Sequence, residues 1–263
     1  MARLGLGSTM LLVALGLGAA SGCRRGDAVR QAADAGSRES AESAQAKAAA
    51  DQEQATAKQA LARWAARMKG ILGALPATQG LKPGCDNLAV PAPLASVDSA
   101  LLESIKRSPN GVVSATGAAG YPSLQSPAVR TLFHGAHREH AASLKQAMAA
   151  AVELDANKFL AVFDLSEVTR PNMLSRDSWA GGAMKGALVV FDLSNDSAVC
   201  RIPLVAKTPS KSEAAKRYGA VDTSGIDLER QILDWTAMEF RRKAEERLGK
   251  IDGGVSLAKG SAS

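Results

Sequence analysis

Three histidines are the residues of this chain whose type and spacing suggest metal chemistry. They are all the histidines of the 263-residue sequence and stand at every third position, as His134, His137 and His140. Neighbouring histidines three residues apart on a helix lie close enough to share a zinc or copper ion. The first and third lie about 120° apart around a helix axis, so all three converge poorly on one ion. Two interpretations stay open: polar positions on a partly exposed helix, or a metal site or pH-responsive group.

Two aspartates, Asp164 and Asp192, occupy equal positions in a repeated Phe-Asp-Leu-Ser sequence. A pair of carboxylates can serve general acid–base catalysis, but an aspartate that follows an apolar strand more often makes a turn. We expect the turn role. The chain has no glycine-rich phosphate loop, no serine in a Gly-x-Ser-x-Gly setting and no His-Glu-x-x-His motif. The sequence therefore favours a non-catalytic protein without a cofactor, and zinc or copper at the histidines is the alternative.

A stretch with the character of a leader precedes Cys23, the first of three cysteines. It has one early cation, Arg3, an apolar segment from Leu4 to about Leu17, and small residues before the cysteine. This is the layout of a secretory signal. The apolar segment is shorter than the roughly 20 residues that span a bilayer core. Residues 1–22 are therefore predicted to be a signal peptide.

The residues Ala20-Ser21-Gly22-Cys23 resemble the lipobox of bacterial lipoproteins, although Ala20 stands where leucine is most common. The resemblance covers these four residues and the apolar run before them. It implies that a peptidase cuts before Cys23, which carries the lipid and becomes the new N-terminus. Arg24 follows in place of the aspartate that favours inner-membrane retention, so the resemblance implies an outer-membrane anchor with the domain in the periplasm. The alternative is cleavage near Ala20 and a secreted, soluble protein.

The other two cysteines, Cys85 and Cys200, are predicted to form a disulfide. An oxidising compartment outside the cytoplasm favours such a bond. It would leave Cys23 as the odd cysteine, which a lipid accounts for. In chain-entropy models, closing a loop of about 100 residues contributes on the order of 4 to 5 kcal/mol. The alternative is two separate buried thiols.

The chain before the globular domain is predicted to be a lipid anchor followed by a tether. Residues 23–60 are rich in Ala, Gln, Glu and Lys with almost no large apolar side chain, which predicts a helical or disordered tether. An apolar face at three- and four-residue spacing then predicts a docking helix at 61–75. That helix opens a globular domain over 61–252, and the tail at 253–263 is predicted to be disordered. Assembly of several chains through the tether helix is a further alternative.

Apolar periodicity predicts the elements of the globular domain. The predicted strands are 111–115, 158–165, 184–193 and 198–206, the predicted helices are 97–107, 127–154 and 226–251, and 207–220 is predicted to be a polar connection. Pro203 has no amide hydrogen and therefore places its strand at a sheet edge or beside a bulge. Trp179 is expected to cover the sheet, with ligand contact as the alternative. The fold class is α+β: a small, mainly antiparallel β-meander packed on one face by the two long helices and preceded by the tether.

The formal net charge is +6 and the pI is near 9.3, yet basic and acidic residues are interspersed and only 4% of residues are aromatic. A nucleic-acid partner is therefore not expected, and the charge suits anionic lipids or wall polymers better. We interpret the chain as an envelope lipoprotein anchored in the lipid bilayer through acylated Cys23. Its domain would bind or scaffold an envelope protein or cell-wall polymer without catalysis. The alternative is a metal-binding or metal-dependent periplasmic protein that uses the three histidines.

Overall fold

The structure is a computed structural model that describes residues 25–81, 83–85, 94–108, 120–133, 141–175, 178–219 and 228–248. For residues 25–41 and 141–142 it describes the helical backbone alone. The predicted signal peptide with Cys23, the three histidines, the predicted strand 111–115 and the tail 253–263 lie outside the described residues. The predictions for these segments therefore stay predictions. None of the described helices has a stretch both long and apolar enough to cross a membrane.

The chain divides into two compact units, Met1–Ala49 and Ala50–Ser263, with the boundary inside helix α1 (Arg25–Ala74). In the first unit the described residues are all helical. The second unit holds the sheet and the remaining elements. The division agrees with a polar N-terminal segment that has no apolar face to bury and a C-terminal part of α1 that has one.

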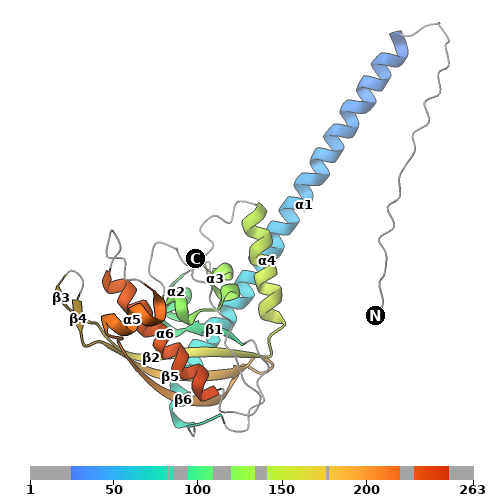
Figure 1. The fold of residues 1–263 in the computed structure, drawn as a ribbon. Coiled ribbons are helices and arrows are strands. Elements are labelled where there is room, and N and C mark those ends of the chain that lie inside the picture. Colours follow the sequence, from blue (N-terminus) through green and yellow to red (C-terminus); the bar gives the residue numbers. More distant parts are fainter. Residues whose placement is uncertain are drawn as a thin grey trace, which may run out of the picture. The chain divides into compact units, whose positions relative to one another are not determined.

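The sheet of the second unit contains β1 (Ala95–Asp98), β2 (Phe159–Thr169), β5 (Ala183–Asp192) and β6 (Ser197–Lys207). They lie in the order β1-β2-β5-β6 (Figure 1). The β2–β5 and β5–β6 pairs are antiparallel, and β1 is parallel to β2. The α+β class and the mainly antiparallel sheet are thus confirmed. The three long strands form at the three apolar runs, and β6 is an edge strand, as Pro203 predicts.

Strand β1 differs from the prediction, which had a helix begin at residue 97. The chain is extended up to Asp98, and helix α2 (Ser99–Arg107) starts only after it. Asp98 caps α2 by accepting a hydrogen bond from the amide of Leu101 at 3.0 Å. Capping by an aspartate side chain requires non-helical backbone at the cap, which explains why the helix starts later than its apolar periodicity suggests.

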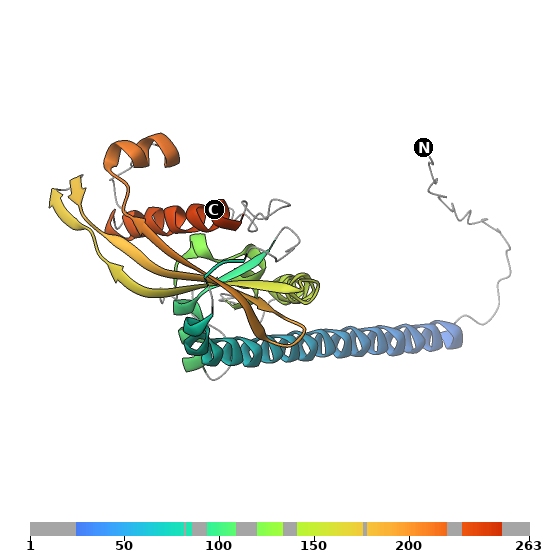
Figure 2. The same ribbon diagram turned by 90° about the horizontal axis from the view of Figure 1, so that it is seen from below.

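Both faces of the sheet are buried under apolar side chains. Successive side chains of β2 point to opposite faces and contribute to two different cores. Leu160 and Val162 join one core, whereas Phe159, Ala161 and Phe163 join the other. The first core is built with the C-terminal part of α1 and with α2, α3 (Pro127–Phe133) and α4 (Ala141–Asp155), and the second with α6 (Leu228–Leu248). Figure 2 shows α6 and the C-terminal part of α1 on opposite sides of the sheet. The prediction that the helices cover one face is therefore wrong.

The two predicted long helices are recovered in part. The predicted helix 127–154 is helical at both ends, in α3 and α4, and its middle lies outside the described residues. The predicted helix 226–251 is present as α6. Three elements were not expected: the antiparallel strands β3 (Asn172–Ser175) and β4 (Ser178–Ala180) between β2 and β5, and helix α5 (Lys211–Tyr218) in the predicted polar connection.

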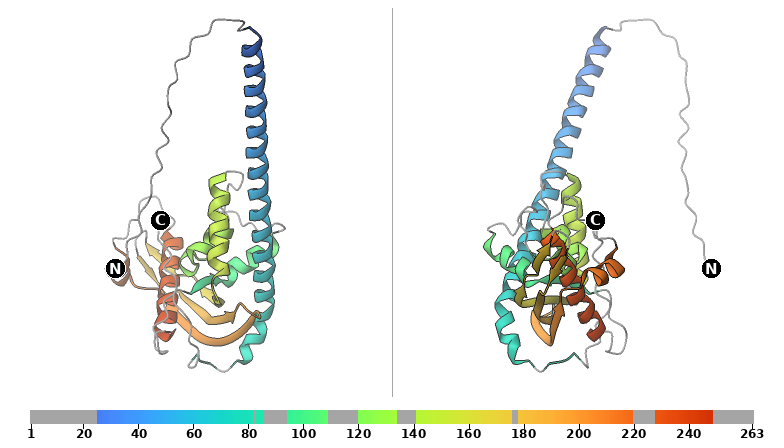
Figure 3. Two further views of the ribbon diagram at one scale, coloured as in Figure 1. Left: turned by 90° about the vertical axis from the view of Figure 1, so that its right-hand side faces the viewer. Right: turned by 60° about the vertical axis from the view of Figure 1, so that its left-hand side comes forward.

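The predicted docking helix 61–75 forms the C-terminal part of α1 and the start of η1 (Leu75–Gly80). Its buried apolar residues are Leu61, Trp64, Met68, Ile71 and Leu75. The Trp64 indole Nε1 donates to Asp155 Oδ1 of α4 at 3.0 Å, and Arg63 pairs with the same carboxylate. Figure 3 shows the C-terminal part of α1 beside α4. Packing and polar contacts together hold this helix on the first core.

A disulfide joins Cys85 to Cys200 of β6, with a Cα–Cα distance of 5.2 Å and a sequence separation of 115. The predicted bond is thus present, and the alternative of two separate thiols is wrong. Beside it, the amide of Gly84 donates to the carbonyl of Arg201 at 3.0 Å. Arg201 Nη1 in turn donates to Thr78 Oγ1 at 2.8 Å and to Asp164 Oδ2 at 3.0 Å. The segment that follows the docking helix is therefore fixed to the outer edge of β6.

Candidate ligand-binding cleft

The predicted site residues fall into two groups. Cys85 and Cys200 are bonded to each other, whereas Cys23, His134, His137 and His140 lie outside the described residues. Across the described ranges, no three or more His, Cys, Asp or Glu side chains gather in a way that could hold a metal ion. Within the described ranges, a candidate site therefore rests on other side chains.

Asp164 and Asp192 do not form a carboxylate pair. In the β2–β5 register Asp192 lies opposite Phe159 and Asp164 lies opposite Ala187. Five residues along a strand separate the two positions by about 17 Å. Asp192 Oδ1 accepts from the amide and hydroxyl of Ser194 at 2.8 and 2.6 Å, hydrogen bonds that lower the pKa of Asp192. Asp192 thus makes the expected turn, and Asp164 instead pairs with the partly buried Arg201 at 3.0 Å.

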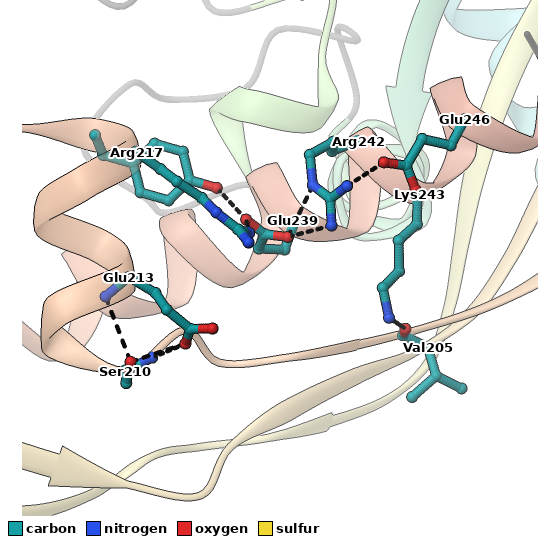
Figure 4. Close-up of polar contacts among 9 residues, drawn as sticks. Val205, Ser210, Glu213, Arg217, Glu239, Arg242, Lys243 and Glu246 are labelled. Carbon is teal, nitrogen blue, oxygen red and sulfur yellow. Dashed lines mark hydrogen bonds and ion pairs between the residues drawn. The ribbon is translucent and has the colours of Figure 1, made fainter.

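A polar network around Glu239 joins α5 to α6 (Figure 4). Glu239 is only 5% exposed and accepts hydrogen bonds from Arg217, from the Tyr218 hydroxyl at 2.8 Å and from Arg242 Nε at 3.0 Å. Burial opposes ionisation of this carboxyl, but the three donors hold the pKa of Glu239 below its usual value. The charges satisfy one another, so we regard the network as the attachment of α5, whose one buried residue is Ala214.

Trp179 and Tyr218 complete this attachment, because each ring packs against Trp235 of α6. The Tyr218 ring stacks on Trp235 with centroids 6.2 Å apart, and Trp179 lies 5.8 Å from Trp235 at a tilt of 37°. The Trp179 Nε1 donates to the carbonyl of Pro209 at 2.9 Å. Trp179 therefore packs against α6 and the segment before α5. Its indole serves the packing of the domain.

The outer edge of β6 carries two features that hinder a further strand. Pro203 offers no amide donor, and Lys243 Nζ of α6 donates to the carbonyl of Val205 at 2.6 Å. Proline and lysine at an edge are common means of preventing strand addition. Together with the Gly84–Arg201 hydrogen bond, these contacts argue against this edge as a docking site for an extended peptide.

A cleft of about 710 Å³ opens between the start of α2, the segment Gly120–Pro122, Arg170 after β2 and the first turns of α6. We call it the Tyr121 cleft. Tyr121, Pro122 and Leu233 contribute apolar surface. Its polar side chains are Arg170, Glu229, Arg230, Gln231 and Asp234. A concave surface with apolar walls and a few polar groups is the usual form of a small-ligand site.

Asp98 fixes one wall of the Tyr121 cleft from below. This carboxyl is fully buried, and its Oδ2 accepts from the amide of Tyr121 at 3.2 Å and from Gln125 Nε2 at 2.7 Å. Gly120 approaches so closely, with φ +82°, that a Cβ there would lie 2.3 Å from Asp98 Oδ1. Desolvation raises the pKa of Asp98 from 3.8 to about 6, against the opposing effect of the hydrogen bonds. The buried carboxyl thus connects the start of α2 to the cleft wall.

The polar groups of the cleft differ in how well they are satisfied. Arg170 Nη1 pairs with Glu229 Oε1 at 3.0 Å. In contrast, Gln231 Oε1 and Asp234 Oδ1 are buried and have no hydrogen-bond partner among the residues that the structure describes. Burial and the Asp98 carboxylate raise the pKa of the Tyr121 phenol, with Arg170 acting in the opposite direction. The phenol is therefore neutral at physiological pH and can donate or accept.

Sequence reasoning missed this cleft because four separate segments build it. Only Asp98 had a local signal, as a capping residue before an apolar helical pattern. Gln231 and Asp234 lie one turn apart on a helix whose polar positions give no sign of burial on their own. Their surroundings follow from the packing of α6 beside η2 (Pro122–Leu124), where Arg241 donates to the carbonyl of Ser123 at 2.9 Å.

Comparison with known proteins does not assign a family. No protein-family model matches the chain, and no curated protein does. Among solved structures, the hypothetical protein CT253 from Chlamydia trachomatis matches with 18% identity and a TM-score of 0.22. That match covers 38% of this chain and spans 58% of the length of the other.

Proposed function

We propose that this protein is an envelope lipoprotein, anchored in the outer membrane through acylated Cys23, whose α+β domain binds an envelope component in the periplasm. The observation that carries the proposal is the Cys85–Cys200 disulfide. It uses two of the three cysteines of the chain and leaves Cys23 of the lipobox. Disulfides of this kind persist in oxidising compartments, which supports a position outside the cytoplasm. Cys23, the cysteine outside the disulfide, would then be the site of lipid attachment.

The helix α1 supports a tether between the lipid and the domain. It begins at Arg25, two residues after Cys23. From residue 42 to 56 every side chain is exposed or half-exposed, and burial begins at Ala57. Residues 25–56 would span about 50 Å as a helix, at 1.5 Å per residue. We infer that this part of α1 is the spacer and that residues 57–75 join it to the domain.

Binding, in place of catalysis, is the activity that the Tyr121 cleft supports. Arg170 and Glu229 of the cleft pair with each other, and the buried Asp98 accepts hydrogen bonds from backbone amides and from the Gln125 side chain. These groups stabilise the conformation of the cleft walls. What the cleft offers a ligand is a concave surface with an apolar wall of Tyr121, Pro122 and Leu233. The domain would therefore capture an envelope component and keep it near the membrane.

Membrane fractionation of the full-length protein tests the anchor. The wild type is expected in the membrane fraction and in the detergent phase of a two-phase separation, and the Cys23→Ser variant in the soluble fraction. The matched control is the Cys85→Ser/Cys200→Ser double variant, which lacks the disulfide but keeps the lipobox and should stay with the membrane. If the wild type is soluble, the anchor proposal fails. If the Cys23→Ser variant stays in the membrane, another part of the chain attaches it.

A further inference from the structure

We propose that a groove between the outer edge of β6 and helix α6 binds a linear envelope molecule that carries repeated phosphate groups. The groove consists of two hollows of about 680 and 420 Å³, which share Val205 of β6 and Lys243 of α6. We call it the β6–α6 groove. It gives the domain a second binding surface besides the Tyr121 cleft. The location of the ligand in the envelope rests on the proposed function, whereas the groove itself does not.

The lining of the β6–α6 groove has an excess of positive charge. It contains three carboxylates and five cations, which are Lys207, Arg217, Arg242, Lys243 and Arg247. Two of the carboxylates, Glu239 and Glu246, already pair with the two arginines of the network between α5 and α6. In the described part of the chain, Lys207, Lys243 and Arg247 have no carboxylate partner. The groove therefore attracts an anionic ligand.

These three cations can be reached from the solvent. Lys207 and Arg247 are exposed. Lys243 extends from α6 to β6, where its Nζ donates to the carbonyl of Val205 at 2.6 Å (Figure 4). Because an ammonium group has three donors, this bond leaves two of them for a ligand. A phosphate in the groove can thus accept charge-assisted hydrogen bonds from side chains that stay exposed in the free protein.

The spacing of the cations favours a chain of anions over a single one. Arg247 lines the first hollow, Lys207 lines the second, and Lys243 lines both. Lys243 and Arg247 are one helical turn apart, about 5–6 Å between their Cβ atoms. Lys207 follows Val205, the contact of Lys243, by two strand positions or about 7 Å. Neighbouring phosphates joined through a short polyol can span such intervals.

The walls of the groove favour a phosphate chain over other polyanions. An acidic peptide would bind an edge strand through main-chain hydrogen bonds, which Pro203 and Lys243 hinder at β6. A single-stranded nucleic acid stacks its bases on aromatic side chains, and none of the described residues that line the groove is aromatic. A polyol phosphate chain needs neither feature. Its carbon atoms can pack on Pro203, Leu204 and Val205.

The test titrates the full-length mature protein, in a non-ionic detergent, with a synthetic oligomer of six glycerol phosphate units. Calorimetry at several salt concentrations follows the binding. The wild type should bind saturably, and the logarithm of its affinity should fall with that of the salt concentration at a slope of about −2 if three phosphates are neutralised.

Lys207→Ala and Arg247→Ala should each weaken binding about three- to fivefold, and the double variant about tenfold. Lys145→Ala is the matched control, because it removes the same charge from the exposed surface of α4, on the opposite side of the sheet. It should bind as the wild type does. Thermal unfolding of each variant shows that it is folded.

Absence of saturable binding by the wild type, or unchanged affinity in the double variant, would overturn the inference. Equal affinity for a single glycerol phosphate would overturn it too, because the ligand would not be a chain. Tighter binding of a hexaglutamate peptide, or binding to phosphatidylglycerol vesicles alone, would show that the ligand is a peptide or a membrane surface.

The mass of the same preparation separates this test from that of the anchor. Lipid on Cys23 without binding of the oligomer refutes the phosphate ligand alone. Binding of the oligomer by a lipid-free protein supports the groove and refutes the anchor.

Discussion

The buried carboxyl of Asp98 should make the stability of the domain depend on pH in an unusual direction. In the folded protein its pKa is about 6, compared with 3.8 for an unperturbed carboxyl. The folded state therefore keeps this proton at pH values where the unfolded state has lost it. The stability from Asp98 is present in full below pH 3.8 and is lost as the pH rises through about 6. The difference between the two pKa values corresponds to about 3 kcal/mol.

The measurement is urea unfolding of the wild type and of Asp98→Asn between pH 4 and pH 7. The asparagine does not titrate, and the other carboxyls contribute equally to both proteins and cancel in the difference. The unfolded chain is already partly ionised at pH 4, so the stability of the wild type relative to the variant should fall by about 2 kcal/mol from pH 4 to pH 7. Asp192→Asn is the matched control. Ser194 lowers the pKa of Asp192, so the stability of the wild type relative to this variant should rise, not fall, with increasing pH. A difference for Asp98 that is independent of pH would refute the reasoning.

Three further predictions concern the cleft wall, the disulfide and the histidines. Gly120→Ala should destabilise the domain by about 1–3 kcal/mol, because the residue has φ +82° and its Cβ would lie 2.3 Å from a buried carboxylate oxygen. Gly70→Ala, in a helix and with nothing within 4 Å of the added Cβ, should stabilise the domain by about 1 kcal/mol. Urea unfolding measures both changes. Reducing the Cys85–Cys200 bond should cost about 2–5 kcal/mol and lower the Tm, while the melting of a double Cys→Ser variant should not respond to reductant. The purified protein should hold far less than one equivalent of zinc or copper; metal that is lost in His137→Ala would instead support a metal site.

The long strands could be predicted because their apolar runs are continuous. The run from Phe159 to Phe163 is buried at every position, which is the pattern of a strand covered on both faces. A strand buried on both faces also requires packing elements on both faces of the sheet, which excludes a sheet covered by helices on one face only. Strand β1 is only four residues long and has no periodicity to distinguish it from the helix that follows.

Helix α5 and the Tyr121 cleft could not be predicted from the sequence, because both depend on contacts between distant segments. The capping residues Ser210 and Glu213 of α5 are visible in the sequence, and the structure contains the full capping box. The helix is nevertheless polar, and it is held by Glu239 of α6 across the tertiary structure. The cleft depends in the same way on contacts between distant segments, such as that of Asp98 with Tyr121.

The central claim is that a lipid on Cys23 anchors this protein. Its most direct test is the intact mass of the protein extracted from membranes, followed by mass spectrometry of its N-terminal peptide. The account predicts a chain that begins at Cys23 and carries a lipid-sized addition on that residue. A lipid-free chain that begins after Ala20 or a neighbouring residue would contradict it.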